Sequence, residues 1–243
     1  MTSVSLCLSA LLFASASDAN ASGIKTIFVL PMSHLDIGFT HTPGEVRDKM
    51  IEATDEALDE AATNPDYVWN VETFWQLDQW LRAKPTPQRV QQLVELVRAG
   101  RFGIGAAYLT PHSALMTNWM LERLCEPATT WAGQHGLTLT WAVLNDVPGH
   151  PPDMPRFLAR AGVKYLAIGA NQSLSPALRA SYCNRPFWWE APTGERVLTW
   201  IAAEAYMDAY TMLGIDPGNA RWFAREKFTA DDMTVMRQGI TDT

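Results

Sequence analysis

Residues 25–63 read KTIFVLPMSHLDIGFTHTPGEVRDKMIEATDEALDEAAT and combine a strand pattern with a helix pattern. The run 25–32 is apolar and rich in β-branched residues, which predicts a buried strand followed by polar residues. A helix is then expected to begin with Thr42 as N-cap, Pro43 at its first position and Glu45 completing a capping box, and to continue to the end of the stretch. A strand followed by a helix is the building unit of α/β proteins.

The rest of the chain continues this alternation. Strands are expected at 67–71, 102–108, 137–144, 163–168, 187–190 and 196–202, and helices around Phe74–Trp80 and over 85–99, 115–132 and 154–160. With the first strand this makes about seven, so the sequence predicts an α/β fold with a mostly parallel sheet covered by helices. In such folds the functional site lies at the carboxyl ends of the strands.

The first 21 residues resemble a secretory signal peptide. An apolar run from Val4 to Ala14 precedes small residues and the triplet Ala19-Asn20-Ala21, which fits a cleavage site. We therefore expect a secreted or periplasmic protein whose residues 22–243 form a single α/β domain. No apolar run approaches the roughly 20 residues that span a bilayer, so stable membrane insertion is not expected.

The charge balance argues against a nucleic-acid partner. The chain has 19 Lys and Arg against 26 Asp and Glu, a formal net charge of -7, so it lacks the basic excess that binds phosphate backbones. Neither a Gly-x-Gly-x-x-Gly motif nor a Walker-type motif follows the first strand, which argues against dinucleotide and nucleotide binding. Aromatic residues are plentiful and suit stacking on sugars as well as core packing. The oligomeric state is left open.

Three polar residues lie where two expected strands end. His34 and Asp36 are two residues apart after the first strand, so an imidazole and a carboxylate can point to the same side and bind one ion. Asp146 follows the strand 137–144. Each residue also has a structural explanation: either aspartate can cap a turn, and His34 can be a hydrogen-bonded core histidine.

The order of four segments resembles glycoside hydrolase family 38, the zinc-dependent α-mannosidases, over roughly residues 25–206. The segment 33–39, Ser-His-Leu-Asp-Ile-Gly-Phe, resembles the family's His-x-Asp-x-Gly-Trp, and 100–102, Gly-Arg-Phe, resembles a strand start of the family. The segment 146–150, Asp-Val-Pro-Gly-His, resembles Asp-x-Phe-Gly-His. The fourth segment, Phe-Trp-Trp-Glu at 187–190 with Gly-Glu-Arg-Val-Leu at 194–198, resembles a strand pair of the family.

The resemblance implies a seven-stranded (β/α) barrel-like domain of the glycoside hydrolase and deacetylase type, acting on an α-mannoside or a related α-glycoside with retention. It makes His34 and Asp36 ligands of one zinc ion, and Asp146 both a zinc ligand and the nucleophile. It further implies that the carbohydrate substrate contacts three aromatic residues, Phe39, Trp189 and Tyr206.

The resemblance leaves the general acid and the fourth zinc ligand without a clear match, so the domain is expected to be incomplete at its C-terminus. For the fourth ligand the candidates are His112 and His150, and for the acid they are Glu204 and Asp208.

Two other functions remain open at this point. One is a carbohydrate-binding relative without a complete catalytic set. The other, less favoured, is a metal-dependent polysaccharide deacetylase, which uses a closely spaced histidine pair, whereas none of the five histidines here are three to five residues apart. The absence of His-Glu-x-x-His argues against a zincin protease.

Overall fold

A computed structural model describes residues 30–171, 183 and 185–202. The chain divides into two compact units, of which Met32–Ala205 contains every described helix and strand. The second unit, residues 1–31 with 206–243, lies outside the described residues except at its positions 30 and 31. The expected leader 1–21 thus lies outside the described residues, and the expected single domain over 22–243 stays a prediction.

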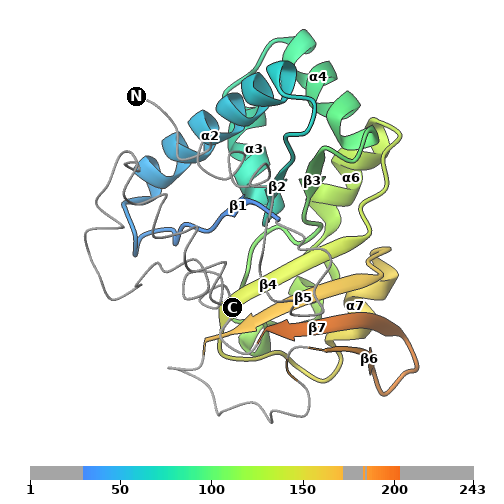
Figure 1. Ribbon diagram of the computed structural model, residues 1–243. Coiled ribbons are helices and arrows are strands. Elements are labelled where there is room, and N and C mark those ends of the chain that lie inside the picture. Colours follow the sequence, from blue (N-terminus) through green and yellow to red (C-terminus); the bar gives the residue numbers. More distant parts are fainter. Residues whose placement is uncertain (1–29, 172–182, 184, 203–243) are drawn as a thin grey trace, which may run out of the picture. The chain divides into compact units, whose positions relative to one another are not determined.

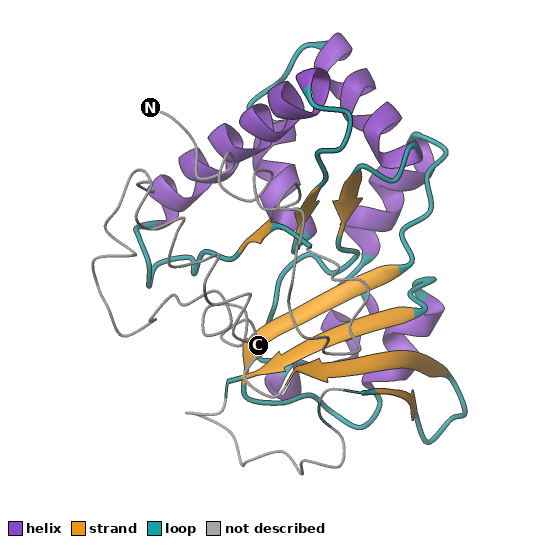
Figure 2. Ribbon diagram, viewed as in Figure 1, coloured by secondary structure: helices purple, strands orange, loops and turns teal. Residues whose placement is uncertain are grey.

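Strands and helices alternate through the larger unit (Figures 1 and 2). In chain order the elements are β1 (Met32–Ser33), α2 (Pro43–Thr63), β2 (Trp69–Val71), α3 (Phe74–Arg82), α4 (Pro87–Arg98), β3 (Phe102–Ile104), the 3-10 helix η2 (Ser113–Leu115), α5 (Asn118–Glu122), α6 (Glu126–Gln134), β4 (Trp141–Val147), α7 (Met154–Arg160), β5 (Tyr165–Ala170), β6 (Pro186–Glu190) and β7 (Arg196–Ala202).

The strands form two sheets. The first has the order β1-β2-β3 and is parallel throughout, and the second has the order β4-β5-β7-β6, in which only the β6–β7 pair is antiparallel. This confirms the α/β class. No closed barrel is formed by the described residues, so the expected seven-stranded barrel is corrected to two sheets. The physical reason lies after β3, where the link to β4 is a backbone hydrogen bond of 2.9 Å from Ala106 N to Trp141 O rather than a paired ladder.

Helix α2 begins and ends where the sequence predicts. Glu45 N donates to Thr42 Oγ1 at 3.4 Å, and Thr42 N donates to Glu45 Oε2 at 3.0 Å, which is the expected capping box. Pro43 occupies the first turn, where the missing N–H costs nothing. Helix α7 and strand β7 also have their predicted bounds.

The helix expected over 115–132 is wrong. The structure divides this segment into η2, α5 and α6. Thr117 starts α5 by accepting a hydrogen bond from Met120 N at 3.3 Å, and Pro127 lies in the first turn of α6. Because proline has no N–H to donate to the preceding turn, α5 cannot continue through Pro127, and a new helix starts there.

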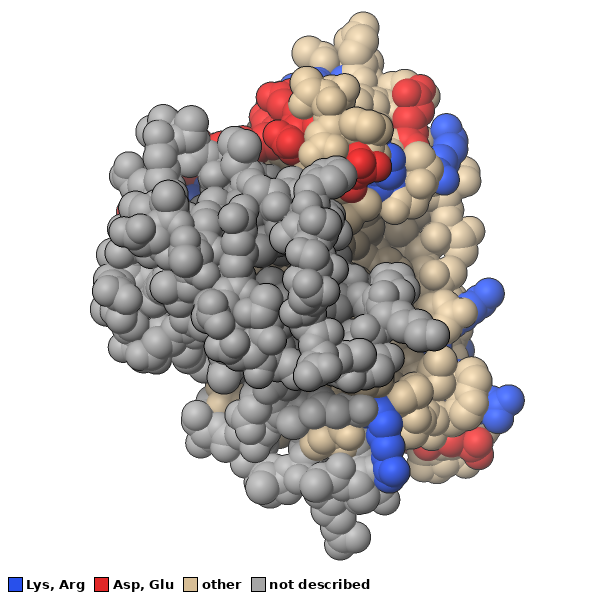
Figure 3. Space-filling model, in the orientation of Figure 1, with Lys and Arg blue, Asp and Glu red and all other residues tan. Residues whose placement is uncertain are grey.

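Helices cover one face of each sheet. α2, α3 and α4 pack together beside the first sheet, and α7 packs on β6 and β7 of the second (Figure 1). Arg89 of α4 joins two carboxylates of α2, Asp55 at 3.0 Å and Asp59 at 2.6 Å. Acidic and basic side chains accordingly lie close together over the region of α2 and α4 (Figure 3). Among the helices of the described residues, none is long and apolar enough to cross a bilayer.

Arg101, in the Gly-Arg-Phe segment, has a structural role at the end of α2. Its guanidinium donates to three backbone carbonyls, those of Ala61 at 2.9 Å, Asn64 at 2.5 Å and Tyr67 at 3.3 Å. The last carbonyls of a helix have no partner within the helix, so a charged donor stabilises them. Arg101 therefore ties the end of α2 to the beginning of β3.

We expect Arg101→Ala to lower the free energy of unfolding by about 2 kcal/mol, because charge-assisted hydrogen bonds to partly buried carbonyls are lost. Urea unfolding followed by circular dichroism measures the change. Arg47→Ala is the matched control, since Arg47 on α2 pairs with its exposed neighbour Asp48 and should cost less than about 0.5 kcal/mol. Equal effects of the two substitutions would contradict the assigned role.

Candidate metal centre

The polar residues singled out in the sequence lie at or just after strand ends. His34 comes directly after β1, Asp36 two residues later, and Asp146 lies next to last in β4. Glu72, directly after β2, joins them. Parallel strands place their carboxyl ends on one side, so residues far apart in the chain gather at one place.

Asp146 has an unusual backbone. The pairing of β4 with β5 shifts register between Asn145 and Val147, so Asp146 is an extra residue that forms a β-bulge. Its φ of 58° lies in the left-handed region, which aspartate tolerates better than most residues. The bulge turns the Asp146 side chain out of the regular in-and-out alternation of the strand. Such local strain is typical of functional positions.

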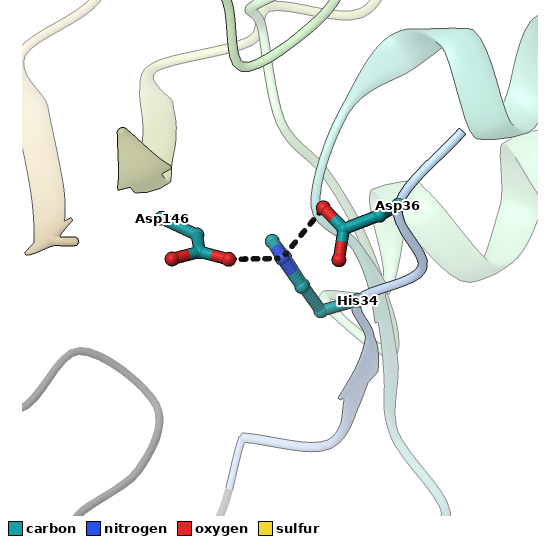
Figure 4. Close-up of side chains that lie close together, drawn as sticks. All are labelled: His34, Asp36 and Asp146. Carbon is teal, nitrogen blue, oxygen red and sulfur yellow. Dashed lines mark ion pairs between the residues drawn. The ribbon is translucent and has the colours of Figure 1, made fainter. Parts of the chain in front are cut away.

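His34, Asp36 and Asp146 converge on one point. His34 Nε2 lies 3.8 Å from Asp36 Oδ1 and 3.8 Å from Asp146 Oδ2, and one ligand atom from each residue lies within 4.8 Å of the others. Figure 4 shows the imidazole between the two carboxylates.

This donor set fits a metal ion. Two ligands at zinc bond lengths of about 2.1 Å are at most about 4.2 Å apart, so both His–Asp distances are already suitable and the widest separation needs only a small carboxylate movement. One imidazole nitrogen with two carboxylate oxygens suits zinc and other first-row divalent ions. By its geometry and donor chemistry the group could therefore hold a metal ion.

Glu72 is the residue of this centre that sequence reasoning missed. Its carboxylate Oε2 lies 2.7 Å from His34 Nδ1, and its side chain is only 3% exposed. The signal in the sequence was weak, because it consisted of a single glutamate directly after a three-residue strand. What identifies Glu72 is contact with a histidine 38 positions earlier, which depends on the pairing of β1 with β2.

The first turn of α3 holds this arrangement in place. Gln76 Oε1 accepts a hydrogen bond from Glu72 N at 2.9 Å, and Gln76 Nε2 donates to Ser33 O at 2.8 Å. Phe74 N donates to Ala107 O at 2.9 Å, which ties the helix start to the segment after β3. Hydrogen bonds thus join α3 to the backbone of Glu72 and to the backbone that precedes His34.

The charges around His34 favour its protonated form. Burial lowers the pKa of His34, but the hydrogen bond to Glu72 and the negative charges of Glu72, Asp36 and Asp146 outweigh burial, so the pKa is raised. The three carboxylates thus make this point attractive to positive charge.

The other predicted site residues that the structure describes are not part of this group of three. Phe39 is 89% exposed in the turn after Asp36, and His112 is exposed at the start of η2. Trp189 is half-buried on β6, packs against the core and lies 6.3 Å from His150, ring centre to ring centre. Three candidates, Tyr206, Glu204 and Asp208, lie outside the described residues.

His150 joins two loops. Its Nδ1 lies 2.6 Å from Ser113 Oγ, so it links the segment after β4 to the segment after β3. Burial lowers the pKa of His150 to about 4, because it removes the water that would stabilise the imidazolium. His150 is therefore neutral at pH 7, and it is not among the three converging residues.

Comparisons with known proteins give a family. Residues 25–234 match the profile of the N-terminal domain of glycosyl hydrolases family 38. No curated protein sequence matches the chain.

Two crystal structures from Enterococcus faecalis are similar in fold. An alpha-mannosidase of strain V583 has a TM-score of 0.57 at 18% identity, covering 82% of this chain and 21% of that chain. A protein in the glycosyl hydrolase family 38 has a TM-score of 0.56 at 16% identity, covering 88% of this chain and 24% of that chain. At these identities the likeness concerns the fold alone. The chain thus spans about a quarter or less of these relatives.

We expect replacement of His150 to make the free energy of unfolding depend less on pH between pH 7 and pH 4. The pKa of His150 in the folded protein, about 4, lies below the ordinary value of 6.5, so as the pH falls from 6.5 towards 4 the unfolded chain gains a proton that the folded protein does not take up. The free energy of unfolding then falls by up to about 3 kcal/mol in the wild type, and this loss should be missing in His150→Asn.

Urea unfolding of metal-free protein at pH 7 and pH 4 measures the difference. His112→Asn, which replaces an exposed histidine, is the matched control. A His150→Asn profile parallel to that of the wild type would show that His150 is not held neutral.

Proposed function

We propose a function from the family of this chain, which belongs to glycosyl hydrolase family 38 through its N-terminal domain. In this proposal the chain contributes the metal-binding and nucleophile-bearing part of an active site that hydrolyses α-mannosides or related α-glycosides. The observation that carries the proposal is the convergence of His34, Asp36 and Asp146, whose ligand atoms lie within 4.8 Å of one another. This arrangement joins one strand end from each of two separate sheets. A chance cluster of exposed acidic residues would not be expected at strand ends of an α/β fold.

The proposed ion is zinc, held by His34, Asp36 and Asp146. When bound, it supplies positive charge that fixes sugar hydroxyls and favours the ionised form of the adjacent carboxylate. The chain contributes an imidazole that is only 14% exposed and two carboxylates that are 40% and 26% exposed. His34 is therefore the most buried of the three, and the two aspartates are more accessible to an approaching substrate.

Asp146 is the proposed nucleophile. In a retaining mechanism one of its oxygens forms a bond to the anomeric carbon while the bond from that carbon to the leaving oxygen breaks, and a general acid protonates that oxygen. Water then attacks the glycosyl-enzyme, releases Asp146 and gives its proton to the same acid group, now a base. The bulge supports this role, since it directs the Asp146 side chain away from the regular strand pattern.

The acid partner is a further part of the proposal. We assign it to Glu204 or Asp208, near Tyr206 in the chain. Phe39, exposed three residues after Asp36, is the proposed stacking surface for a sugar ring, together with Trp189 and Tyr206. The fourth metal ligand is assigned to His112 or His150.

The proposed location follows from the sequence. The run Val4–Ala14 with the triplet 19–21 supports export by a signal peptide, to the periplasm or the cell exterior. A secreted or periplasmic enzyme of this type meets carbohydrate substrates directly.

We expect the chain to bind one zinc ion, and each of His34→Ala, Asp36→Asn and Asp146→Asn to weaken binding strongly. Asparagine tolerates the left-handed backbone at position 146 as well as aspartate does, so the Asp146→Asn fold should be preserved. Zinc analysis after dialysis and competition with a chromophoric chelator measure binding. Asp153→Asn is the matched control, because Asp153 pairs with Arg156 and is not one of the three converging residues.

Hydrolysis of an aryl α-mannoside tests the nucleophile. We expect any turnover by the chain to fall more than about 1,000-fold in Asp146→Ala. Turnover that survives this substitution would refute the assignment. Because the general acid has no clear match in the sequence, we expect the wild-type chain to bind zinc and to hydrolyse the mannoside weakly or not at all.

A further inference from the structure

Glu72 is a buried carboxylate with a single charged partner. Its side chain is 3% exposed, and within the described part of the chain its ion pair is with His34. Its second oxygen, Oε1, is buried and accepts no hydrogen bond from the described residues. A buried carboxylate is costly unless a positive group compensates it, so the negative charge of Glu72 acts mainly on the His34 ring.

The geometry determines which nitrogen of His34 carries hydrogen. Nδ1 lies 2.7 Å from Glu72 Oε2, and a carboxylate only accepts, so Nδ1 must be the donor. Nε2 is the nitrogen that faces Asp36 and Asp146, at 3.8 Å from each. In a neutral imidazole with hydrogen on Nδ1, Nε2 carries the lone pair that binds an ion.

The backbone around Glu72 leaves it little freedom. Its N–H is held by Gln76, which also holds the carbonyl of Ser33. On the other side, Gly105 donates to Val71 O at 3.0 Å, and a Cβ at position 105 would collide with the Glu72 carbonyl. The same contacts that fix the Glu72 backbone thus fix the segment that carries His34.

We propose that Glu72 is a positioning residue of the metal centre: it holds His34 with hydrogen on Nδ1 and presents Nε2 to the ion. This inference rests on the proposed function for the identity of the ion, but the orientation of His34 is a property of the metal-free chain. Residues that hold a metal-binding histidine in this way usually change metal affinity by about 10- to 100-fold when they are replaced.

Two substitutions separate charge from shape. Glu72→Gln keeps the length and an oxygen acceptor but removes the charge, and Glu72→Met keeps the length and removes both. We expect zinc affinity to fall about 10- to 100-fold in Glu72→Met and less in Glu72→Gln, so that the amide partly rescues binding. If zinc affinity were lost through altered packing alone, the loss would not depend on whether residue 72 can accept a hydrogen bond, and Glu72→Gln would not be the milder variant.

The matched control is Asp78→Asn. Asp78 is a second partly buried carboxylate of the α3 region, and it accepts from the Tyr108 hydroxyl at 2.8 Å rather than from a histidine. The zinc affinity of the Asp78→Asn variant should equal that of the wild type. Thermal unfolding of each metal-free variant shows which variants are folded, and Glu72→Gln carries the test if Glu72→Met does not fold.

The second measurement does not need the metal. Long-range 15N–1H NMR of the metal-free chain at alkaline pH distinguishes the two forms of the neutral imidazole, and we expect His34 with hydrogen on Nδ1 in the wild type and a mixture in Glu72→Met. Hydrogen on Nε2 in the wild type, or wild-type zinc affinity in both Glu72 variants, would overturn the inference. A wild-type chain that binds no zinc yet shows Nδ1–H at His34 would refute the proposed function and leave the role of Glu72 intact.

Discussion

The hydrogen bonds at the start of α3 are the constraint on which the candidate site depends. Gln76 holds both the Glu72 amide and the Ser33 carbonyl, and Glu72 holds the His34 ring. A helix start leaves amides without partners, and here the amides of Phe74 and Trp75 bind carbonyls of the segment after β3. The side chain of Gln76, the third helical residue, binds the ends of β1 and β2. The same interactions therefore complete the helix, join it to the sheet and orient the side chain proposed to bind metal.

The second constraint is local and lies in β4. A regular strand alternates its side chains between two faces. In β4 this alternation is interrupted between Asn145 and Val147, where Asp146 is an extra residue. The extra residue at the bulge adopts φ of 58°, which aspartate tolerates because its short polar side chain interacts with nearby backbone. A strained carboxylate therefore faces an imidazole that comes from the other sheet. The carboxylates of Asp36 and Asp146 both face Nε2 of one imidazole, and a divalent ion between them would relieve their mutual repulsion.

Family-like segments of the sequence have different physical roles. The segment around His34 and Asp36 and the segment at Asp146 carry the converging side chains. Arg101 instead satisfies carbonyls at the end of α2, and His150 joins two loops as a neutral imidazole. A resemblance in sequence therefore marks positions that the fold needs as well as positions suited to chemistry, and contacts are required to separate the two.

The sequence by itself determined the local elements and the polar residues at strand ends. Capping and periodicity depend on residues close together in the chain, so α2, α7 and β7 have the predicted bounds. The helix expected over 115–132 was wrong, because Pro127 interrupts it. The tertiary structure alone decided the division into two sheets, the contact of Glu72 with His34 and the bulge at Asp146. These depend on strand pairing between residues tens of positions apart, and pairing is set by packing of the whole chain, which no local pattern encodes.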